Sequence, residues 1–140
     1  MYNKNMDENT YIGVEKASQI LQVSSYAIRR FCDSGYIPHI KRNRQYQRVL
    51  SPAQFELLAM LVQMQQFGFS KSEIKRYAKL ARQGQASATE RLAILTTRKH
   101  QLQSEIKSRQ AAIDFIERQE EISARVQAAM PPNPDESRES

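Results

Sequence analysis

The C-terminal part of the chain contains an unusually long stretch without a helix breaker. Residues 87–129, 43 in all, include neither glycine nor proline. As one helix this stretch would be about 65 Å long. Its apolar side chains follow a heptad repeat and form one narrow stripe, which Lys99 and Arg109 interrupt: Leu92, Leu95, Leu102, Ile106, Ile113 and Ile116. Such a helix is not stable alone in water and needs a partner.

We therefore expect residues 87–129 to be a coiled-coil dimerisation helix whose stripe faces a second copy of the chain. The alternative is that the helix folds back on its own domain. Beyond Ile116 the apolar pattern changes frame and continues at Phe115, Ile122 and Val126. The polar, proline-containing residues 130–140 are predicted to be a disordered tail, and residues 1–10 a flexible N-terminus.

Positive charge is concentrated in the first part of the chain. Residues 1–86 contain 13 Lys/Arg and 6 Asp/Glu, a net charge of +7, whereas residues 87–140 contain 8 and 9, a net charge of −1. The densest stretch has a single acid, Asp33, and six basic residues: Arg29, Arg30, Lys41, Arg42, Arg44 and Arg48. A basic half joined to a neutral half is typical of a polyanion-binding module with a separate second function. The alternative, an ordinary solvated basic face, is the one that charge alone favours.

The apolar pattern of residues 11–84 predicts several short elements. Helical spacing predicts helices over about 14–21 and 25–34, and the three residues between them form the turn of a helix-turn-helix unit. Residues 39–50 read as a small hairpin that turns near Arg42 and Asn43. Capping boxes beginning at Ser51 and Ser70 predict helices ending near Phe67 and Gly84. A third box is predicted at Ser87.

The second helix of the predicted unit has a face suited to DNA. At 100° per residue, Ala27, Ile28 and Phe31 fall on one side, and Tyr26, Arg29, Arg30 and Asp33 fall on the other. Arginine matches phosphate oxygens and the guanine edge, and tyrosine can bond phosphate and pack on sugar. The basic hairpin beside the unit is predicted to be a wing. Tyr46 has two readings of about equal weight, a DNA contact or core packing beneath the hairpin. The candidate DNA-binding residues are Ser25, Tyr26, Arg29, Arg30, Lys41, Arg42, Arg44, Tyr46 and Arg48.

Other function classes find little support in the composition. The single cysteine, Cys32, excludes an internal disulfide and a thiolate cluster, and we expect it to be an inert packing residue. We read His39 and His100 as surface residues. The sequence has no Gly-rich phosphate loop and no nucleophile–base pattern. The longest apolar run is six residues, and the polar N-terminus does not resemble a secretory signal. We expect a cytoplasmic, nucleoid-associated protein that is not an enzyme and has no cofactor, metal or membrane partner.

Three motifs in order resemble the mercury-resistance regulator (MerR) family of bacterial transcription factors. Residues 23–38, VSSYAIRRFCDSGYIP, resemble the family signature V-S-x-x-T-L-R-Y-Y-E-x-x-G-L-I-x-P. Residues 48–51 resemble the R-x-Y-S that closes the family's wing. Residues 67–74, FGFSKSEI, are similar to L-G-F-S-L-x-E-I. The resemblance covers residues 11–125 and departs from the family at Arg30, Cys32 and Tyr46, where the family has tyrosine, glutamate and glycine.

The resemblance implies a mainly α fold, with a winged helix-turn-helix domain over 11–84 and a dimerisation helix over 87–129 that forms an antiparallel coiled coil. It further implies a homodimer that binds a palindromic operator in double-stranded DNA. Family members distort the operator so that RNA polymerase can use the promoter, or simply repress. By position, Arg29 and Arg48 would contact DNA. The family's metal and thiol sensors have cysteines near the dimerisation helix, and this chain has none after Cys32.

Two further hypotheses remain beside the sequence-specific regulator. An architectural, chromosome-organising protein would use the same module with little sequence preference. A coiled-coil adaptor would bind protein rather than DNA through its basic half. A regulator should prefer its operator over other duplexes by about 10³-fold or more, which separates it from the architectural protein. Loss of nucleic-acid binding at moderate salt would favour the adaptor.

Overall fold

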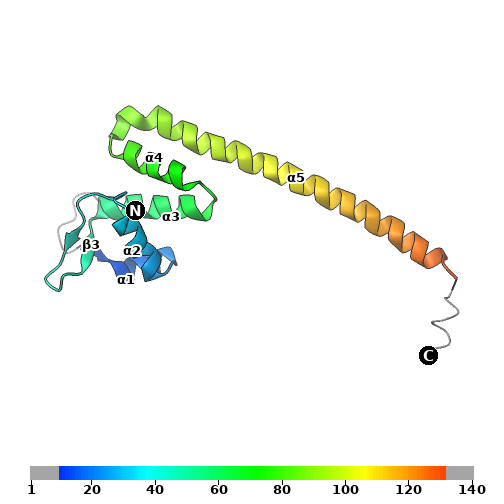
Figure 1. The fold of residues 1–140 in the computed structure, drawn as a ribbon, viewed down its shortest axis with the longest axis horizontal. Coiled ribbons are helices and arrows are strands. Elements are labelled where there is room, and N and C mark those ends of the chain that lie inside the picture. The colour runs from blue at the N-terminus through cyan, green and yellow to red at the C-terminus, as the bar shows by residue number, and fades with distance from the viewer. Residues whose placement is uncertain (1–9, 132–140) are drawn as a thin grey trace, which may run out of the picture. The chain divides into compact units, whose positions relative to one another are not determined.

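The structure, a computed structural model, describes residues 10–131, so most of the predicted flexible N-terminus and disordered tail lies outside the described residues. The chain forms two units, one ending at Thr96 and the other beginning at Thr97. The elements, labelled in Figure 1, are β1 (Ile12–Gly13), α1 (Val14–Leu21), α2 (Ser25–Asp33), β2 (Lys41–Arg42), β3 (Arg48–Leu50), α3 (Pro52–Gln66), α4 (Lys71–Ala81), the 3₁₀ helix η2 (Gly84–Ser87) and α5 (Ala88–Ala129).

The predicted helix-turn-helix unit is confirmed by α1 and α2. α1 ends at Gln22, whose backbone is left-handed (φ 56°) and whose amide donates to the Ser18 carbonyl. α2 begins after Ser24, whose side-chain oxygen accepts a hydrogen bond from the Ala27 amide at 3.1 Å. The turn between the two helices needs only three residues, because Gln22 ends α1 in a left-handed conformation and Ser24 already caps the start of α2.

The predicted hairpin is also present, but its turn lies later than expected, because Arg42 belongs to β2 and the chain turns between Asn43 and Gln47. A third strand joins the hairpin. β3 pairs antiparallel with β2 and with β1, so the strand order is β1-β3-β2. In this register Ile12 faces Leu50 and Lys41 faces Val49. Because β1 leads directly into α1, the sheet ties the wing to the start of the helix-turn-helix unit.

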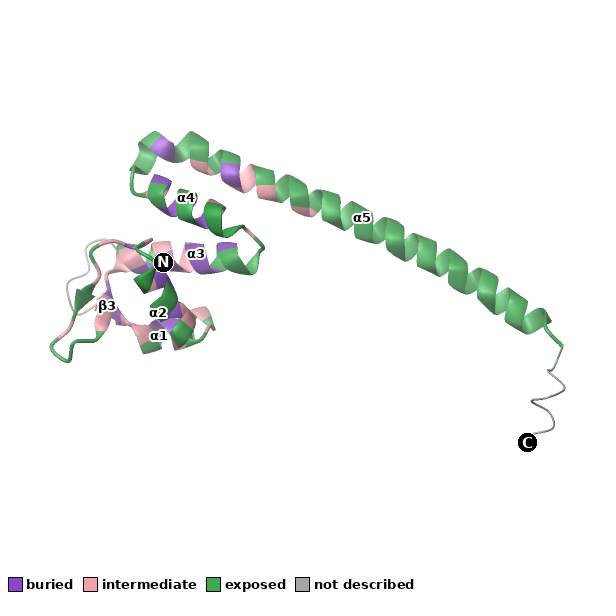
Figure 2. Cartoon of the chain, in the orientation of Figure 1, coloured by how far each residue is buried: buried purple, intermediate pink, exposed green. Residues whose placement is uncertain are grey.

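The core of the first unit is built around α3. Ser51 and Gln54 form the predicted capping box at its start, and Ser70 and Glu73 form the one that begins α4. The apolar side chains of α3 spread around most of its circumference, as expected for a helix covered on several sides. Figure 2 shows buried positions on α1 to α4 and near the start of α5. The largest fully buried apolar side chains are Phe55, Ile28, Leu50, Leu58, Leu61 and Met64.

The third predicted capping box, at Ser87, is wrong. Ser87 ends η2, which continues directly into α5, so its side chain does not cap the first turn of α5. Its buried hydroxyl donates to the carbonyl of Leu80 and to that of Gly84, the second at 2.9 Å. Glu90, the expected partner in the box, pairs instead with Arg76 at 3.1 Å. Ser87 therefore ties the end of α4 to the start of α5.

The long helix predicted over residues 87–129 is confirmed as α5. Its first turns belong to the first unit, where Ile94 is buried and Leu95 packs against the core. In the part of α5 beyond Thr96, Ile106, Ile113 and Ile116 are all about half exposed or more. Among residues 10–131 there is no helix with the length and apolar character needed to cross a membrane.

Candidate nucleic-acid interface

α2 presents a polar face to solvent and an apolar face to the core. Ile28 and Phe31 are buried, whereas Tyr26, Arg29, Arg30 and Asp33 are exposed. The Tyr26 side chain is 68% exposed, and the Arg30 guanidinium carbon lies 5.9 Å from the centre of its ring. The helical-wheel prediction of this outward face is confirmed. A tyrosine and two arginines on one exposed helix face can bond to phosphate and to base edges.

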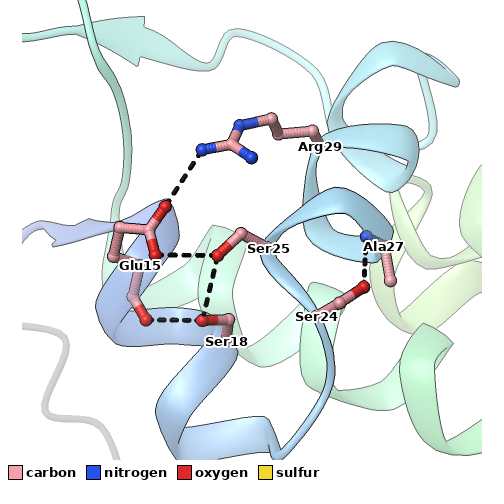
Figure 3. A network of polar contacts seen from close by, with 6 residues as sticks. All are labelled: Glu15, Ser18, Ser24, Ser25, Ala27 and Arg29. Atoms are coloured by element: carbon pink, nitrogen blue, oxygen red, sulfur yellow. Dashed lines mark hydrogen bonds and ion pairs between the residues drawn. The ribbon is translucent and has the colours of Figure 1, made fainter.

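Arg29 is held in place by a polar network between α1 and α2 (Figure 3). Its Nη2 donates to Glu15 Oε1 at 3.0 Å. The other oxygen of Glu15 accepts from the Ser25 hydroxyl at 2.8 Å. Ser25 also lies 3.3 Å from the Ser18 hydroxyl, which donates to the Glu15 carbonyl. Both Arg29 and Ser25, two candidate DNA contacts, are therefore engaged by the same carboxylate, that of Glu15, which no sequence motif marks.

Arg48, the arginine that closes the wing, is paired with Asp33 of α2. Its side chain is only 24% exposed, far less than that of Arg29 at 51%. An ion pair between β3 and α2 fixes the wing beside the outward face of the helix. Arg48 is thus placed to position the wing.

The thiol of Cys32 lies beside this ion pair. Burial raises its pKa above the ordinary value, the positive charge of Arg48 opposes the shift, and the negative charge of Asp33 adds to it. A raised pKa keeps the thiol protonated at neutral pH, and the protonated form is a poor nucleophile and metal ligand. The inert reading of Cys32 agrees with this chemistry.

The tip of the wing is a compact five-residue turn from Asn43 to Gln47. The Asn43 side-chain oxygen accepts from the amides of Gln45 and Gln47 at 3.0 and 2.9 Å, and Arg42 donates to the Tyr46 carbonyl at 2.7 Å. Tyr46 is 80% exposed. The reading that places Tyr46 in a core beneath the hairpin is therefore wrong, because a hairpin with such short strands covers no space for a ring.

The remaining wing candidates do not gather at one point. Lys41 lies 5.9 Å from the ring centre of Tyr11, at the base of the wing. Arg44 is exposed at the tip and has no polar partner in the part of the chain that the structure describes.

Two hollows lie on either side of the outward face of α2. The first, of about 400 Å³, brings together Arg29, Arg42 and Arg48 with Lys16 and Glu15, beside the first turn of α1. The second, of about 320 Å³, lies between α2 and the start of α4 and is lined by residues that include Tyr26, Arg30, Tyr36 and Lys71. Sequence reasoning missed Lys16 and Lys71 because isolated lysines on helices have no motif. The feature that the two lysines share is their position near the start of a helix, α1 for Lys16 and α4 for Lys71.

Within residues 10–131, no group of three or more His, Cys, Asp or Glu side chains is arranged to hold an ion. The basic hollows and the exposed arginine face are instead suited to phosphate.

This fold and this surface define a winged helix-turn-helix protein of the DNA-binding class. Residues 13–80 match the sequence profile of the MerR HTH family regulatory proteins. This region of the chain is therefore of the MerR type, and the members of the MerR family are DNA-binding transcriptional regulators rather than enzymes.

Individual proteins are similar to this chain in sequence or in fold. A protein of Haemophilus influenzae described as an uncharacterized HTH-type transcriptional regulator is 24% identical over 102 residues, which cover 73% of this chain and 76% of the relative. The crystal structure of HiNmlR, a MerR family regulator lacking the sensor domain and bound to promoter DNA, is similar in fold. Its TM-score is 0.66 at 21% identity, over 86% of this chain and 95% of that one. A MerR family regulator from Listeria monocytogenes has a TM-score of 0.67 at 24% identity, over 84% and 93%.

Proposed function

We propose that this protein is a homodimeric transcriptional regulator that recognises an operator in double-stranded DNA through α2 and the wing. The observation that carries the proposal is the basic hollow shared by α1, α2 and the wing, in which three arginines and Lys16 converge. Three separate elements supply these cations, so the cluster exists only in the folded domain. The DNA-bound structure of HiNmlR supports the same partner for this chain.

The geometry of the two hollows fits a helix lying in the major groove. An α-helix with its side chains is about 10–12 Å wide and the groove is about 12 Å wide, so the phosphates of both strands flank the helix. The hollows open on either side of the outward face of α2 and contain Arg29 and Arg48 on one side and Arg30 and Lys71 on the other. In this arrangement Tyr26 and Arg29 reach base edges or phosphates from the exposed face.

The start of α1 adds a backbone contribution to the first hollow. Gly13 precedes the helix and provides no side-chain cap, so the amides of the first turn are not satisfied by a capping side chain. Gly13, Val14 and Glu15 also line the hollow. Free amides at a helix start favour phosphate, and we assign one backbone contact of the DNA to this point.

The dimer in this proposal forms through α5, along the stripe that includes Ile106, Ile113 and Ile116. The charge pattern of α5 supports antiparallel pairing. Residues 88–109 contain five Lys/Arg and two Asp/Glu, whereas residues 110–129 contain two and four. Antiparallel helices place the basic half of one beside the acidic half of the other, while parallel helices would place like charges together.

A two-fold dimer predicts an operator with two-fold symmetry, because each copy of α2 reads one half-site. The family resemblance adds three further parts to the same proposal. The protein distorts the operator, it either lets RNA polymerase use the promoter or represses it, and it associates with the nucleoid.

The test is binding of the purified protein to the duplex upstream of its own gene and to a scrambled duplex of equal length, at several salt concentrations. We expect a preference of about 10³-fold for one duplex, and a slope of log K against log salt steeper than about −4 because several phosphates are neutralised. If the upstream duplex is not preferred, selection from random sequences supplies a candidate operator. Equal binding to all sequences would indicate the architectural protein, and no binding would indicate the adaptor.

A further inference from the structure

The wing tip contains a residue in a backbone conformation that its side chain disfavours. Tyr46 has φ of 61°, in the left-handed region. A residue with a Cβ pays a conformational penalty there that glycine does not, and asparagine tolerates the conformation better than tyrosine. The turn imposes this backbone, since the Tyr46 amide donates to the Asn43 carbonyl at 3.0 Å and Arg42 holds the Tyr46 carbonyl.

The ring of Tyr46 adds little to the stability of the fold and does not offset this conformational penalty. Tyr46 is 80% exposed, the most exposed of the large hydrophobic side chains in the described residues. Within residues 10–131 its ring stacks on no aromatic side chain and lies under no cation, in contrast to Tyr26 and Tyr11. A strained backbone that is held by its surroundings and presents an unpacked side chain is characteristic of a functional position.

The surroundings of Tyr46 indicate what the ring would contact. Arg42 and Arg44 are exposed in the same hairpin, and Arg48 follows two residues later on β3. Arg42 also lines the basic hollow beside α2. A polyanion attracted by these cations would lie against the wing tip, and duplex DNA offers the apolar surfaces of deoxyribose and of base edges for an exposed ring.

We propose that Tyr46 is a DNA-contacting residue whose ring packs against deoxyribose and base edges flanking the segment read by α2. The inference rests on the proposed function and adds a ring contact at the end of the footprint. The hydrogen bonds of Asn43 and Arg42 preorganise the turn, so that binding does not have to order it. The contact is made by the ring rather than by the hydroxyl alone.

The test compares three substitutions at this position on a duplex selected from random sequences with the wild-type protein. Tyr46→Asn and Tyr46→Gly remove the ring and suit a left-handed backbone. We expect each to bind about tenfold more weakly, while the melting temperature stays the same or rises by a few degrees. Tyr46→Phe, which keeps the ring, should bind within about twofold of wild type. Gln45→Ala, at the neighbouring exposed position, is the control and should leave affinity unchanged.

Hydroxyl-radical footprinting supplies an independent readout, because it reports on the sugars. We expect Tyr46→Gly to lose protection of a few flanking sugars while protection at the centre of each half-site persists. Unchanged affinity and an unchanged footprint in both ring-removing variants would overturn the inference while leaving the proposed function intact. Failure of the wild-type protein to bind any duplex overturns both. If Tyr46→Phe also bound about tenfold more weakly, the contact would belong to the hydroxyl, and the ring contact would be overturned.

Discussion

Arg29 of α2 and Glu15 of α1 form an ion pair, with Nη2 and Oε1 3.0 Å apart. Both side chains are more than half exposed, so the pair contributes little to the free energy of unfolding. Its effect lies in orientation, because it holds the guanidinium over the hollow that also contains Arg42 and Arg48. The same carboxylate repels phosphate. Glu15 therefore lowers the affinity for DNA while it orients Arg29 for a specific contact.

Removal of the guanidinium tests the central contact. If Arg29 reads a base, Arg29→Ala should weaken binding to the selected duplex by about 1–3 kcal/mol and relax the preference at one position of each half-site. The measurement is fluorescence anisotropy on duplexes substituted at single positions. Lys107→Ala, which removes a charge from α5, is a suitable control. An unchanged affinity would remove Arg29 from the interface.

Neutralisation of Glu15 should separate affinity from specificity. Glu15→Gln removes a negative charge from the hollow, and we expect binding to any duplex to become about threefold tighter at low salt. The preference for the selected duplex should fall, because Arg29 is no longer held. Anisotropy on the selected and scrambled duplexes measures both quantities. Glu56→Gln, an exposed acid of α3 outside both hollows, should change neither, and a specificity ratio that survives Glu15→Gln would contradict the orienting role.

Removal of Asp33 tests the role of its ion pair with Arg48, because two interpretations of the pair predict opposite changes in DNA affinity. Simple electrostatics predicts that Asp33→Ala, by removing an acid near DNA, should tighten binding. If the pair instead positions the wing, the variant should bind about three- to tenfold more weakly and lose about 0.5–1 kcal/mol of unfolding free energy. Anisotropy and urea unfolding give the two values. Tighter binding by Asp33→Ala would show that the wing does not depend on this contact.

A charge in the stripe of α5 tests the dimer. Ile106 is 66% exposed in the single chain, and pairing of two helices would bury it. Ile106→Asp should therefore yield monomers in sedimentation velocity, because it replaces an apolar side chain of the seam with a charge that pairing would remove from water. Ser108→Asp adds the same charge on another face of α5 and should leave the dimer intact. A dimer that persists in Ile106→Asp at micromolar concentration would refute the assignment of the seam.

The thiol of Cys32 should show the consequence of its raised pKa. Because the folded protein favours the neutral thiol, alkylation by iodoacetamide at pH 8 should be slower in the folded protein than in the urea-unfolded chain. The folded rate should keep rising at pH values where the unfolded thiol is already ionised. The corresponding contribution to the free energy of unfolding is fully present below the pKa of the thiol in the unfolded chain. It is lost as the pH rises through the pKa of the thiol in the folded protein. Equal alkylation rates in both states would contradict this environment.

Features that depend on neighbours in the chain could be predicted from the sequence. The helices of the first unit follow from apolar spacing and from serine caps such as Ser51 and Ser70, which bond to amides three residues away. α5 follows from the absence of breakers over residues 87–129. The two faces of α2 follow from its period. Each of these is a local property, and a sequence window contains all the atoms involved.

Contacts between distant residues were decided only by the tertiary structure. β1 is two residues long and has no periodicity, so its pairing with β3 left no signal in the sequence. Ser87 matched a capping box in the sequence, but its hydroxyl donates a hydrogen bond to the carbonyl of Leu80 instead. The partners of Arg29 and Arg48 lie 14 and 15 residues away, and only the packing of α1, α2 and the wing brings them together. The sequence alone therefore determined the helices and the basic character of the outward face of α2. Folding determined which of its arginines are held by an acid and which residue, Tyr46, stands exposed at the wing tip.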